Sequence, residues 1–547
     1  MRTHALLLLL LPAPTLLAQQ APTAAVTCSV DTTAPTDGSR ALAAERYADA
    51  ETFYAGQMKG KPSISAYAGL VDAQIQLDKP EQALATARQA VAALPTSGEA
   101  AALLGDAELR ASHLDEASAA YARAITLDKC SARAHFGYGR IEGLYSHHSN
   151  EQKQYAIAHR LVPTNAHISE VTFATLPPAP HAKGLRNILA SATDLPPAHR
   201  QHLEQQAALL EAGATCRPSA PDGAKLALTP VFLNGAQTRD YALRVTTGGP
   251  TAVNLELDST APGIVLTGDD AKKLNVKPAV AGQDTAPYLG YVDSMQIGPM
   301  QLGKCAVSVV PDIELGRKYS VIGTSIFRDF KLHLDWVAKV MTLNPYPGPP
   351  VVAAESAPID AVVPDSEEHW SRALIDDSRI LVPAVVEKRP VGLVMIDTSS
   401  TLNMLSPSAA IPFKPSMDQT VSVEGVSGNL VRIFRKDGGG ETDRSAVIGV
   451  NGVAGGGNVP IKRVGNSLSV AFAGNQPPDF TLFSFDITAA SHSAGLDIGG
   501  IVGYSVLRQY FIDIDYRNGL VNLTYDIGFP TRATHDAELT STVSHTL

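Results

Sequence analysis

Two short segments of the sequence place a carboxylate where acid–base chemistry needs one, at the end of an apolar stretch. Asp258 and Ser259 lie in VNLELDSTAPGIVLT, and Asp397 and Thr398 lie in VGLVMIDTSSTLNMLS. A carboxylate beside an apolar core is costly unless it is hydrogen-bonded or paired. A single Asp in this context is more often a turn cap. Because the arrangement occurs twice, the sequence favours a functional role for the two Asp residues over a turn cap.

A second pair of segments, 321–343 and 501–523, aligns without gaps. The alignment matches Gly323 with Gly503, each after an apolar residue, and it also matches Ser, Arg and Asp residues. The two Asp residues of the first pair are closer in the numbering than these two glycines are, so the second copy contains an insertion between its segments. We expect this insertion in the Gly-rich stretch 436–458.

The elements that must position these residues are strands. From about residue 225, short Val, Ile and Leu runs alternate with Gly, Pro, Asn and Asp, a pattern typical of strands and turns. The sequence therefore predicts a multidomain chain, α-helical at first and all-β afterwards. The all-β part is expected to form two related lobes, 225–346 and 360–527, before a frayed polar tail at 528–547.

Each copy resembles a lobe of a retroviral-type, or pepsin-like, aspartic protease. The family signature is two apolar residues, Asp, Thr or Ser, Gly, and Ala or Ser, with a later apolar-apolar-Gly that supports the active-site loop. The resemblance implies two retropepsin-like β-barrel lobes that form a pseudo-twofold pair in one chain. It also implies a catalytic dyad of Asp258 and Asp397, supported by Ser259, Thr398, Gly323 and Gly503.

The chemistry that the resemblance implies is proteolysis by an activated water. Two carboxylates about 3 Å apart share one proton. The ionised one takes a proton from water, and the protonated one donates to the scissile carbonyl. No metal or organic cofactor takes part. A polypeptide substrate or peptide ligand would lie extended under a flap hairpin, for which 287–296 and 423–434 are candidates.

The sequence departs from the family signature at one position in both copies, where Thr260 and Ser399 replace Gly. A Cβ at this position is expected to push the loop away from the carboxylates or to strain its backbone. The next position stays small, as Ala261 and Ser400. Two hypotheses therefore remain open: an exported aspartic-type endopeptidase, and a catalytically inactive lobe pair that binds peptides or proteins.

The helical part of the chain contains an internal repeat. Residues 40–167 are rich in Ala, Leu, Gln and Glu, and the blocks 66–99, 100–133 and 134–167 align without gaps. Ala90, Ala124 and Ala158 occupy the same position in these three blocks. The pattern resembles the tetratricopeptide repeat, which implies stacked helix pairs that bind a protein partner. A helical spacer that only packs on the next domain is the alternative.

Two further features of the helical part carry little chemistry. The Pro-rich range 168–224 is expected to be a linker with one helix, near 198–212. Four of the histidines in the repeat form a cluster in the sequence, and two of these four are adjacent and so cannot share a helix face. We therefore expect no metal site at His135, His147, His148 and His159.

Composition and the N-terminus bound the function. The net charge is −10, without a basic block, which argues against a nucleic-acid partner. Residues 1–18 have a positive start and a short apolar run, as in a signal peptide. An exported chain, periplasmic or secreted, without a membrane span after cleavage, is expected. The spacings leave the pairing of Cys28, Cys130, Cys216 and Cys305 open.

Overall fold

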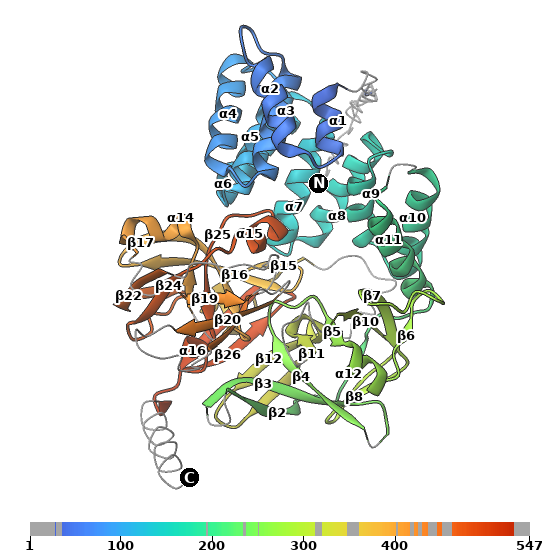
Figure 1. Ribbon diagram of the computed structural model, residues 1–547, viewed down its shortest axis with the longest axis vertical. Helices are drawn as coiled ribbons and strands as arrows, with labels where there is room; N and C mark the ends of the chain where they lie inside the picture. Colours follow the sequence, from blue (N-terminus) through green and yellow to red (C-terminus); the bar gives the residue numbers. More distant parts are fainter. Residues whose placement is uncertain are drawn as a thin grey trace, which may run out of the picture.

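The computed structural model describes residues 28, 36–192, 195–233, 237–249, 251–311, 320–346, 360–400, 403–415, 421–424, 429–435, 446–450 and 462–529. An array of helices comes first in the chain, and strands follow it on one side of the array (Figure 1). The expected signal peptide, 1–18, and all but two residues of the expected tail lie outside the described residues.

Six helices of the array form three successive pairs, one for each block of the repeat. They are α3 (Ile64–Gln76), α4 (Pro80–Ala93), α5 (Gly98–Arg110), α6 (Leu114–Leu127), α7 (Ala132–Leu144) and α8 (His148–Leu161). The hydroxyls of Ser63, Ser97 and Ser131 cap the first helix of each pair by accepting a backbone N–H three residues on. Such a cap satisfies an N–H group that a helix leaves open, so the period also sets where these helices begin.

The small residues of the repeat lie where helices approach closely. Ala90, Ala124 and Ala158 have no exposed surface. A Cβ added to Gly105 would collide with the ring of Tyr121, which is itself fully buried. Large and small side chains at fixed positions therefore interlock from one helix pair to the next.

The array is longer than the repeat predicts. It begins with α1 (Asp37–Ala43) and α2 (Tyr47–Gln57) and continues through α9 (Ala166–Ala174), α10 (Pro178–Ser191) and α11 (Pro197–Glu211). The expectation of a linker with one helix over 168–224 was wrong, because most of α9 and all of α10 and α11 lie there. The two Pro-Pro pairs stand at the starts of α10 and α11, where a helix needs no N–H, so they begin helices instead of breaking them.

The larger sheet carries the first lobe and part of the second. Its strands are joined in the order β14-β27-β26-β12-β13-β2-β3-β4-β11-β5-β10-β7-β6. The bounds in the first lobe are β2 (Ala224–Leu233), β3 (Gln237–Thr246), β4 (Ala252–Asp258), β5 (Ile264–Thr267), β6 (Lys277–Pro278), β7 (Tyr288–Val292), β10 (Cys305–Val310), β11 (Ser320–Gly323), β12 (Phe330–Asp335) and β13 (Val340–Pro345). The second lobe adds β14 (Ser371–Arg372), β26 (Tyr510–Asp515) and β27 (Leu520–Tyr525). Three short strands lie off this path: β1 (Pro218–Ser219), β8 (Met295–Ile297) and β9 (Met300–Leu302).

The smaller sheet belongs to the second lobe and follows the order β15-β16-β17-β25-β18-β24-β22. Its strands are β15 (Leu374–Asp376), β16 (Arg379–Val386), β17 (Arg389–Asp397), β18 (Met404–Leu405), β22 (Lys462–Leu468), β24 (Phe480–Ser484) and β25 (Ile498–Gly503), with β23 (Val470–Phe472) beside β16. A separate three-stranded sheet consists of β19 (Val421–Glu424), β20 (Asn429–Arg435) and β21 (Ala446–Val450). The expected insertion 436–458 contributes β21, and its other residues lie outside the described part.

The expected β-barrels are not closed in the part of the chain that the structure describes. The larger sheet runs as an open path from β14 to β6, and the smaller runs from β15 to β22. β12 of the first lobe pairs with β13 of its own lobe on one side and with β26 of the second lobe on the other, so the sheet continues across the lobes.

The pairing of β12 with β26 is symmetric in register. His333 lies opposite Asp513, its counterpart in the aligned segments, and the residues on either side pair in reciprocal fashion. The imidazole Nδ1 of His333 and Oδ1 of Asp513 are 2.7 Å apart. The strands that matched in the sequence repeat are therefore hydrogen-bonded neighbours.

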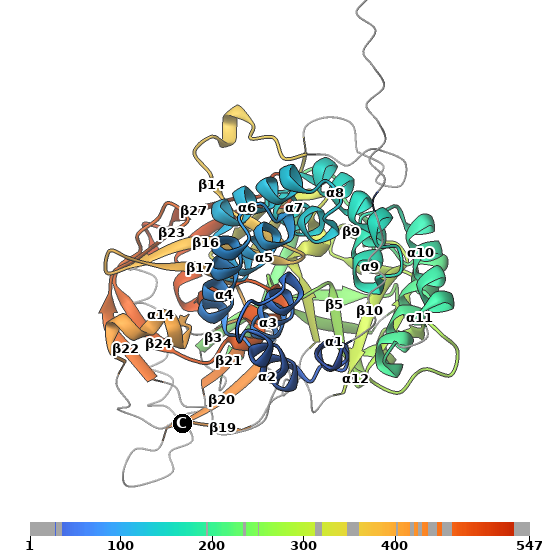
Figure 2. The same cartoon turned by 90° about the horizontal axis from the view of Figure 1, so that it is seen from above.

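The helical array is packed against both lobes, and in Figure 2 its helices arc over the strands. Side chains of α5, α6 and α7 share one buried cluster with the second lobe, including Ile141 and Leu381. The hydroxyl of Ser112 donates to Asp497 O at 2.9 Å. At the other end of the array, Gln205 of α11 accepts the backbone N–H of Leu289 in β7 at 3.0 Å.

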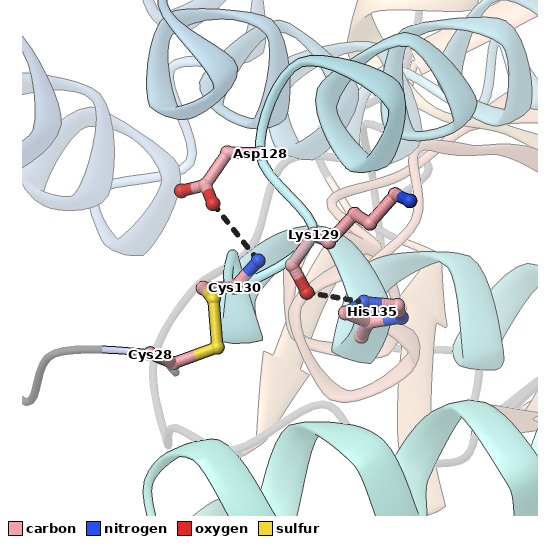
Figure 3. The surroundings of a disulfide bond; sticks show 5 residues. All are labelled: Cys28, Asp128, Lys129, Cys130 and His135. Atoms are coloured by element: carbon pink, nitrogen blue, oxygen red, sulfur yellow. Dashed lines mark hydrogen bonds between the residues drawn. A yellow bond between two sulfur atoms is a disulfide. The ribbon is translucent and has the colours of Figure 1, made fainter. Parts of the chain in front are cut away.

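Two disulfides join segments that are distant in the sequence. Cys216, just after α11, is bonded to Cys305 at the start of β10. Cys28 is bonded to Cys130 in the turn between α6 and α7 (Figure 3). No helix within the described residues combines the length and the apolar character needed to cross a bilayer.

Candidate active site

Each of the two site aspartates ends a buried strand and lies beside a glycine. Asp258 is the last residue of β4 and pairs in parallel with Gly323 of β11. Asp397 is the last residue of β17 and pairs in parallel with Gly503 of β25. A Cβ on Gly323 would collide with the carbonyl oxygen of Ala261 in the loop after Asp258. This glycine therefore lets the first loop pack on its neighbouring strand.

The residues after the two aspartates hold the loops together by reciprocal hydrogen bonds. The backbone N–H of Ser259 donates to Thr398 Oγ1 at 3.1 Å, and the N–H of Thr398 donates to Ser259 Oγ at 3.0 Å. Each hydroxyl then donates across the lobes, Ser259 to Ile396 O at 2.8 Å and Thr398 to Leu257 O at 3.0 Å. The four bonds are equivalent in pairs, so the structure brings together the two loops that the sequence singled out.

The positions that lack glycine are occupied without left-handed backbone. Neither Thr260 nor Ser399 has a positive φ. Thr260 donates to Asp258 Oδ1 from its N–H at 2.9 Å and from its hydroxyl at 2.6 Å. Ser399 does the same for Asp397 Oδ1, at 2.9 Å and 2.8 Å. The expectation that a side chain here strains the loop or displaces it was therefore wrong.

Both site aspartates are completely buried, with 0% exposed surface. Burial penalises a charged carboxylate unless hydrogen bonds replace its hydration. The donors from Thr260 and Ser399 supply such bonds, and the N–H of Ser400 adds another to Asp397 Oδ1 at 3.0 Å. Neither carboxyl has surface in contact with solvent in this structure.

Two residues near the first loop were not singled out from the sequence. Ser378, in the turn between β15 and β16, donates its hydroxyl to Thr260 O at 2.8 Å. The hydroxyl of Tyr516 lies 2.5 Å from Thr324 Oγ1 and 3.5 Å from Ser378 O. Burial, above all, raises the pKa of Tyr516, and the charge of Asp258 acts in the same direction. Tyr516 therefore stays a neutral hydroxyl at neutral pH.

A signal for Tyr516 was present in the repeat, whereas Ser378 had none. In the aligned segments, Tyr516 is the counterpart of Trp336, and Thr324 is the counterpart of Tyr504. The rings of Trp336 and Tyr504 are in edge contact, with centroids 5.6 Å apart. The contact between Thr324 and Tyr516 therefore corresponds to the contact between Tyr504 and Trp336. The first is a hydrogen bond, and the second is a contact between aromatic rings. Ser378 lies outside both pairs of matched segments.

The two flap candidates differ in structure. The segment 287–296 includes β7, which pairs with β10 on one side and β6 on the other. The segment takes part in two hairpins, because β7 pairs with β6 and β8, which begins at Met295, pairs with β9. The segment 423–434 spans β19 and β20, which pair as antiparallel strands, while 425–428 lie outside the described residues. Which hairpin covers the site stays a prediction.

No group of His, Cys, Asp or Glu within the described ranges has the geometry of a metal site. The four histidines of the cluster, His135, His147, His148 and His159, each have a different hydrogen-bond partner. His135, for example, is bonded to Gln154 and to Lys129 O (Figure 3 shows the latter).

Comparison with known proteins yields no family assignment. No family model and no curated protein matches the chain. Among solved structures, an aspartic proteinase from Irpex lacteus is similar over 56% of this chain and 98% of its own, with 11% identity and a TM-score of 0.30. A tetratricopeptide-repeat protein from Thermus thermophilus is similar over 32% and 95%, with 17% identity and a TM-score of 0.28. A structure of MamA is similar over 33% and 98%, with 19% identity and a TM-score of 0.22. These likenesses are too weak to carry an argument about function.

Proposed function

We propose that the chain is an exported aspartic-type endopeptidase whose two lobes act as a retropepsin-like, pseudo-twofold pair. The observation that carries this proposal is the set of reciprocal hydrogen bonds between Ser259 and Thr398. These bonds hold the loops of Asp258 and Asp397 against each other, as a shared catalytic site requires.

The proposed mechanism uses the two carboxyls and one water. With one proton shared between Asp258 and Asp397, the ionised carboxylate takes a proton from the water as its oxygen attacks the scissile carbonyl carbon. The protonated carboxyl gives its proton to the carbonyl oxygen, which yields a gem-diol. A proton then passes to the peptide nitrogen, the C–N bond breaks, and the acid and amine products leave.

The helical array is proposed to act as an interaction module for a protein partner or for the substrate. Its packing against both lobes favours a role in presenting or admitting a polypeptide to the site. Two disulfides support export, because such bonds persist in oxidising compartments.

The decisive experiment measures cleavage of an unfolded protein between pH 3 and pH 7. We expect Asp258→Asn and Asp397→Asn each to abolish cleavage, because either change removes one half of the shared-proton pair. Asp269→Asn is the matched control, since the Asp269 side chain is 73% exposed on α12 (Gly268–Lys273). If both site variants cleave as well as the parent chain, the proposal is wrong.

The complete burial of both aspartates favours one alternative, a catalytically inactive protein that binds peptides or proteins. This alternative predicts saturable binding of an extended peptide with no product formed. Turnover that is blocked by a statine-containing peptide inhibitor would rule it out.

A further inference from the structure

The residue two positions after each site aspartate makes the same pair of contacts in both lobes. Thr260 and Ser399 are counterparts in the two copies, as Asp258 and Asp397 are. Each directs both its N–H and its hydroxyl to Oδ1 of its own aspartate, at distances of 2.6 to 2.9 Å. Because a hydroxyl occupies this position in both copies and makes the same contacts, we treat these contacts as a shared feature of the two lobes.

The two donors constrain how each carboxyl is oriented. A hydrogen bond to a charged oxygen is short and about twice as strong as a neutral one. Two such bonds from one residue to one oxygen fix the rotation of the carboxyl group about its Cβ–Cγ bond. The donors are themselves held, since Thr260 is 2% exposed and Ser399 is 5% exposed.

The first of these residues is also anchored by the opposite lobe. Ser378 of the second lobe donates to Thr260 O at 2.8 Å. The Thr260 backbone is therefore fixed from one side while its N–H and hydroxyl hold Asp258 from the other. Orientation of the first carboxyl thus depends on contacts from both lobes.

We propose that the Thr260 and Ser399 hydroxyls are positioning groups that hold the Asp258 and Asp397 carboxyls in their reactive orientation. This inference rests on the proposed peptidase function. It assigns the two departures from the protease signature a role in the site, so that each side chain adds a donor where glycine offers only its backbone N–H.

The test compares variants that lose or keep the hydroxyl. Thr260→Val and Ser399→Ala remove it, whereas Thr260→Ser and Ser399→Thr retain it. On a peptide substrate, the first two should lower kcat by about 10- to 100-fold, the range expected for one hydrogen bond to a charged group. The KM should change less than about twofold, because the hydroxyls orient the carboxyls and do not touch the substrate. The conservative variants should recover most of kcat.

Three results decide the matter. A kcat within about twofold of the parent for both Thr260→Val and Ser399→Ala, in chains shown to be folded by circular dichroism, overturns the inference. So does a Thr260→Gly, Ser399→Gly double variant that is as active as the parent, because the backbone N–H groups would then suffice. Loss of activity in Thr260→Val with recovery in Thr260→Ser supports it.

A second measurement keeps the inference testable if the parent chain shows no turnover, in which case the proposed function fails by itself. A hydroxyl that donates to a buried carboxyl oxygen stabilises the folded chain, and its removal leaves that oxygen with one donor fewer. Thr260→Val should therefore lower Tm by more than Thr260→Ser does. Equal Tm losses in the two variants contradict the inference.

Discussion

Ser259 and Thr398 each use one hydroxyl for two contacts, accepting a backbone N–H of the other loop and donating to a carbonyl beyond it. The two hydroxyl residues and the two residues whose carbonyls accept from them, Leu257 and Ile396, are all buried, so none of these groups can exchange its partner for water. A hydroxyl that accepts and donates at once leaves no polar group of this contact unsatisfied. At the scale of single residues, the two loops are therefore held together by the hydrogen bonds of two small hydroxyl side chains.

We expect Ser259→Ala to lower the free energy of unfolding by about 2–3 kcal/mol, since it leaves the buried N–H of Thr398 without this acceptor and also breaks the bond from the Ser259 hydroxyl to Ile396 O. Ser259→Thr keeps the hydroxyl and should cost less than half as much. Urea unfolding with fluorescence detection measures both. Equal losses for the two variants would show that shape, and not hydrogen bonding, decides the effect.

At the scale of elements, the lobes are joined by strands that are counterparts in the repeat. β12 and β26 pair in a register centred on His333 and Asp513, and a hydrogen bond links these two side chains. This bond raises the pKa of His333, against the opposing effect of burial. The strand pair therefore carries a titratable link between the lobes.

The sign of the resulting pH dependence follows from that direction. A histidine whose pKa is raised by folding contributes stability that is present below about pH 6.5, the unfolded value, and lost as pH rises through the folded pKa. The Tm of the parent chain should be higher than that of His333→Gln, and this difference in Tm should be larger at pH 5.5 than at pH 8.5. In an Asp513→Asn background, the same substitution should show a smaller pH dependence. A Tm difference that does not change with pH contradicts the role of this pair.

At the scale of the whole molecule, the array and the second lobe share a core. Ile141 and Leu144 of α7 belong to the same buried cluster as Leu381 and Phe485. The array is also joined to the first lobe through Gln205 and through the disulfide between Cys216 and Cys305. With these contacts, the helical array is packed against the two lobes that contain the candidate site and is not a separately moving module.

We expect Ile141→Ala to lower the free energy of unfolding by about 2–5 kcal/mol, because it leaves a cavity in this shared core. The helix signal in far-UV circular dichroism and the fluorescence of the two tryptophans, Trp336 in the first lobe and Trp370 in the second, should change in one coincident transition. Leu127→Ala on α6 is the control, because Leu127 is 42% exposed. Loss of the helix signal well before the tryptophan signal would mean that the array unfolds separately.

The sequence by itself determined the features that depend on local periodicity. The repeat of the helical part indicated the helix pairs, and matched segments in the second half identified Asp258, Asp397 and their neighbours, because such patterns are set by residues close in the chain. The signals that misled were also local. Pro-Pro pairs suggested a linker where they begin helices, and Thr260 and Ser399 suggested strain where they donate to carboxylates.

Only the tertiary structure decided how these pieces meet. The exchange of hydrogen bonds between Ser259 and Thr398 joins two different lobes, and so does the contact of Ser378 with Thr260. The pairing of β12 with β26 continues the larger sheet across the lobes, and the cluster around Ile141 fixes the array on the second lobe. Such contacts depend on which buried surfaces and unsatisfied polar groups the folded chain brings within about 3 Å, and no spacing along the sequence specifies that.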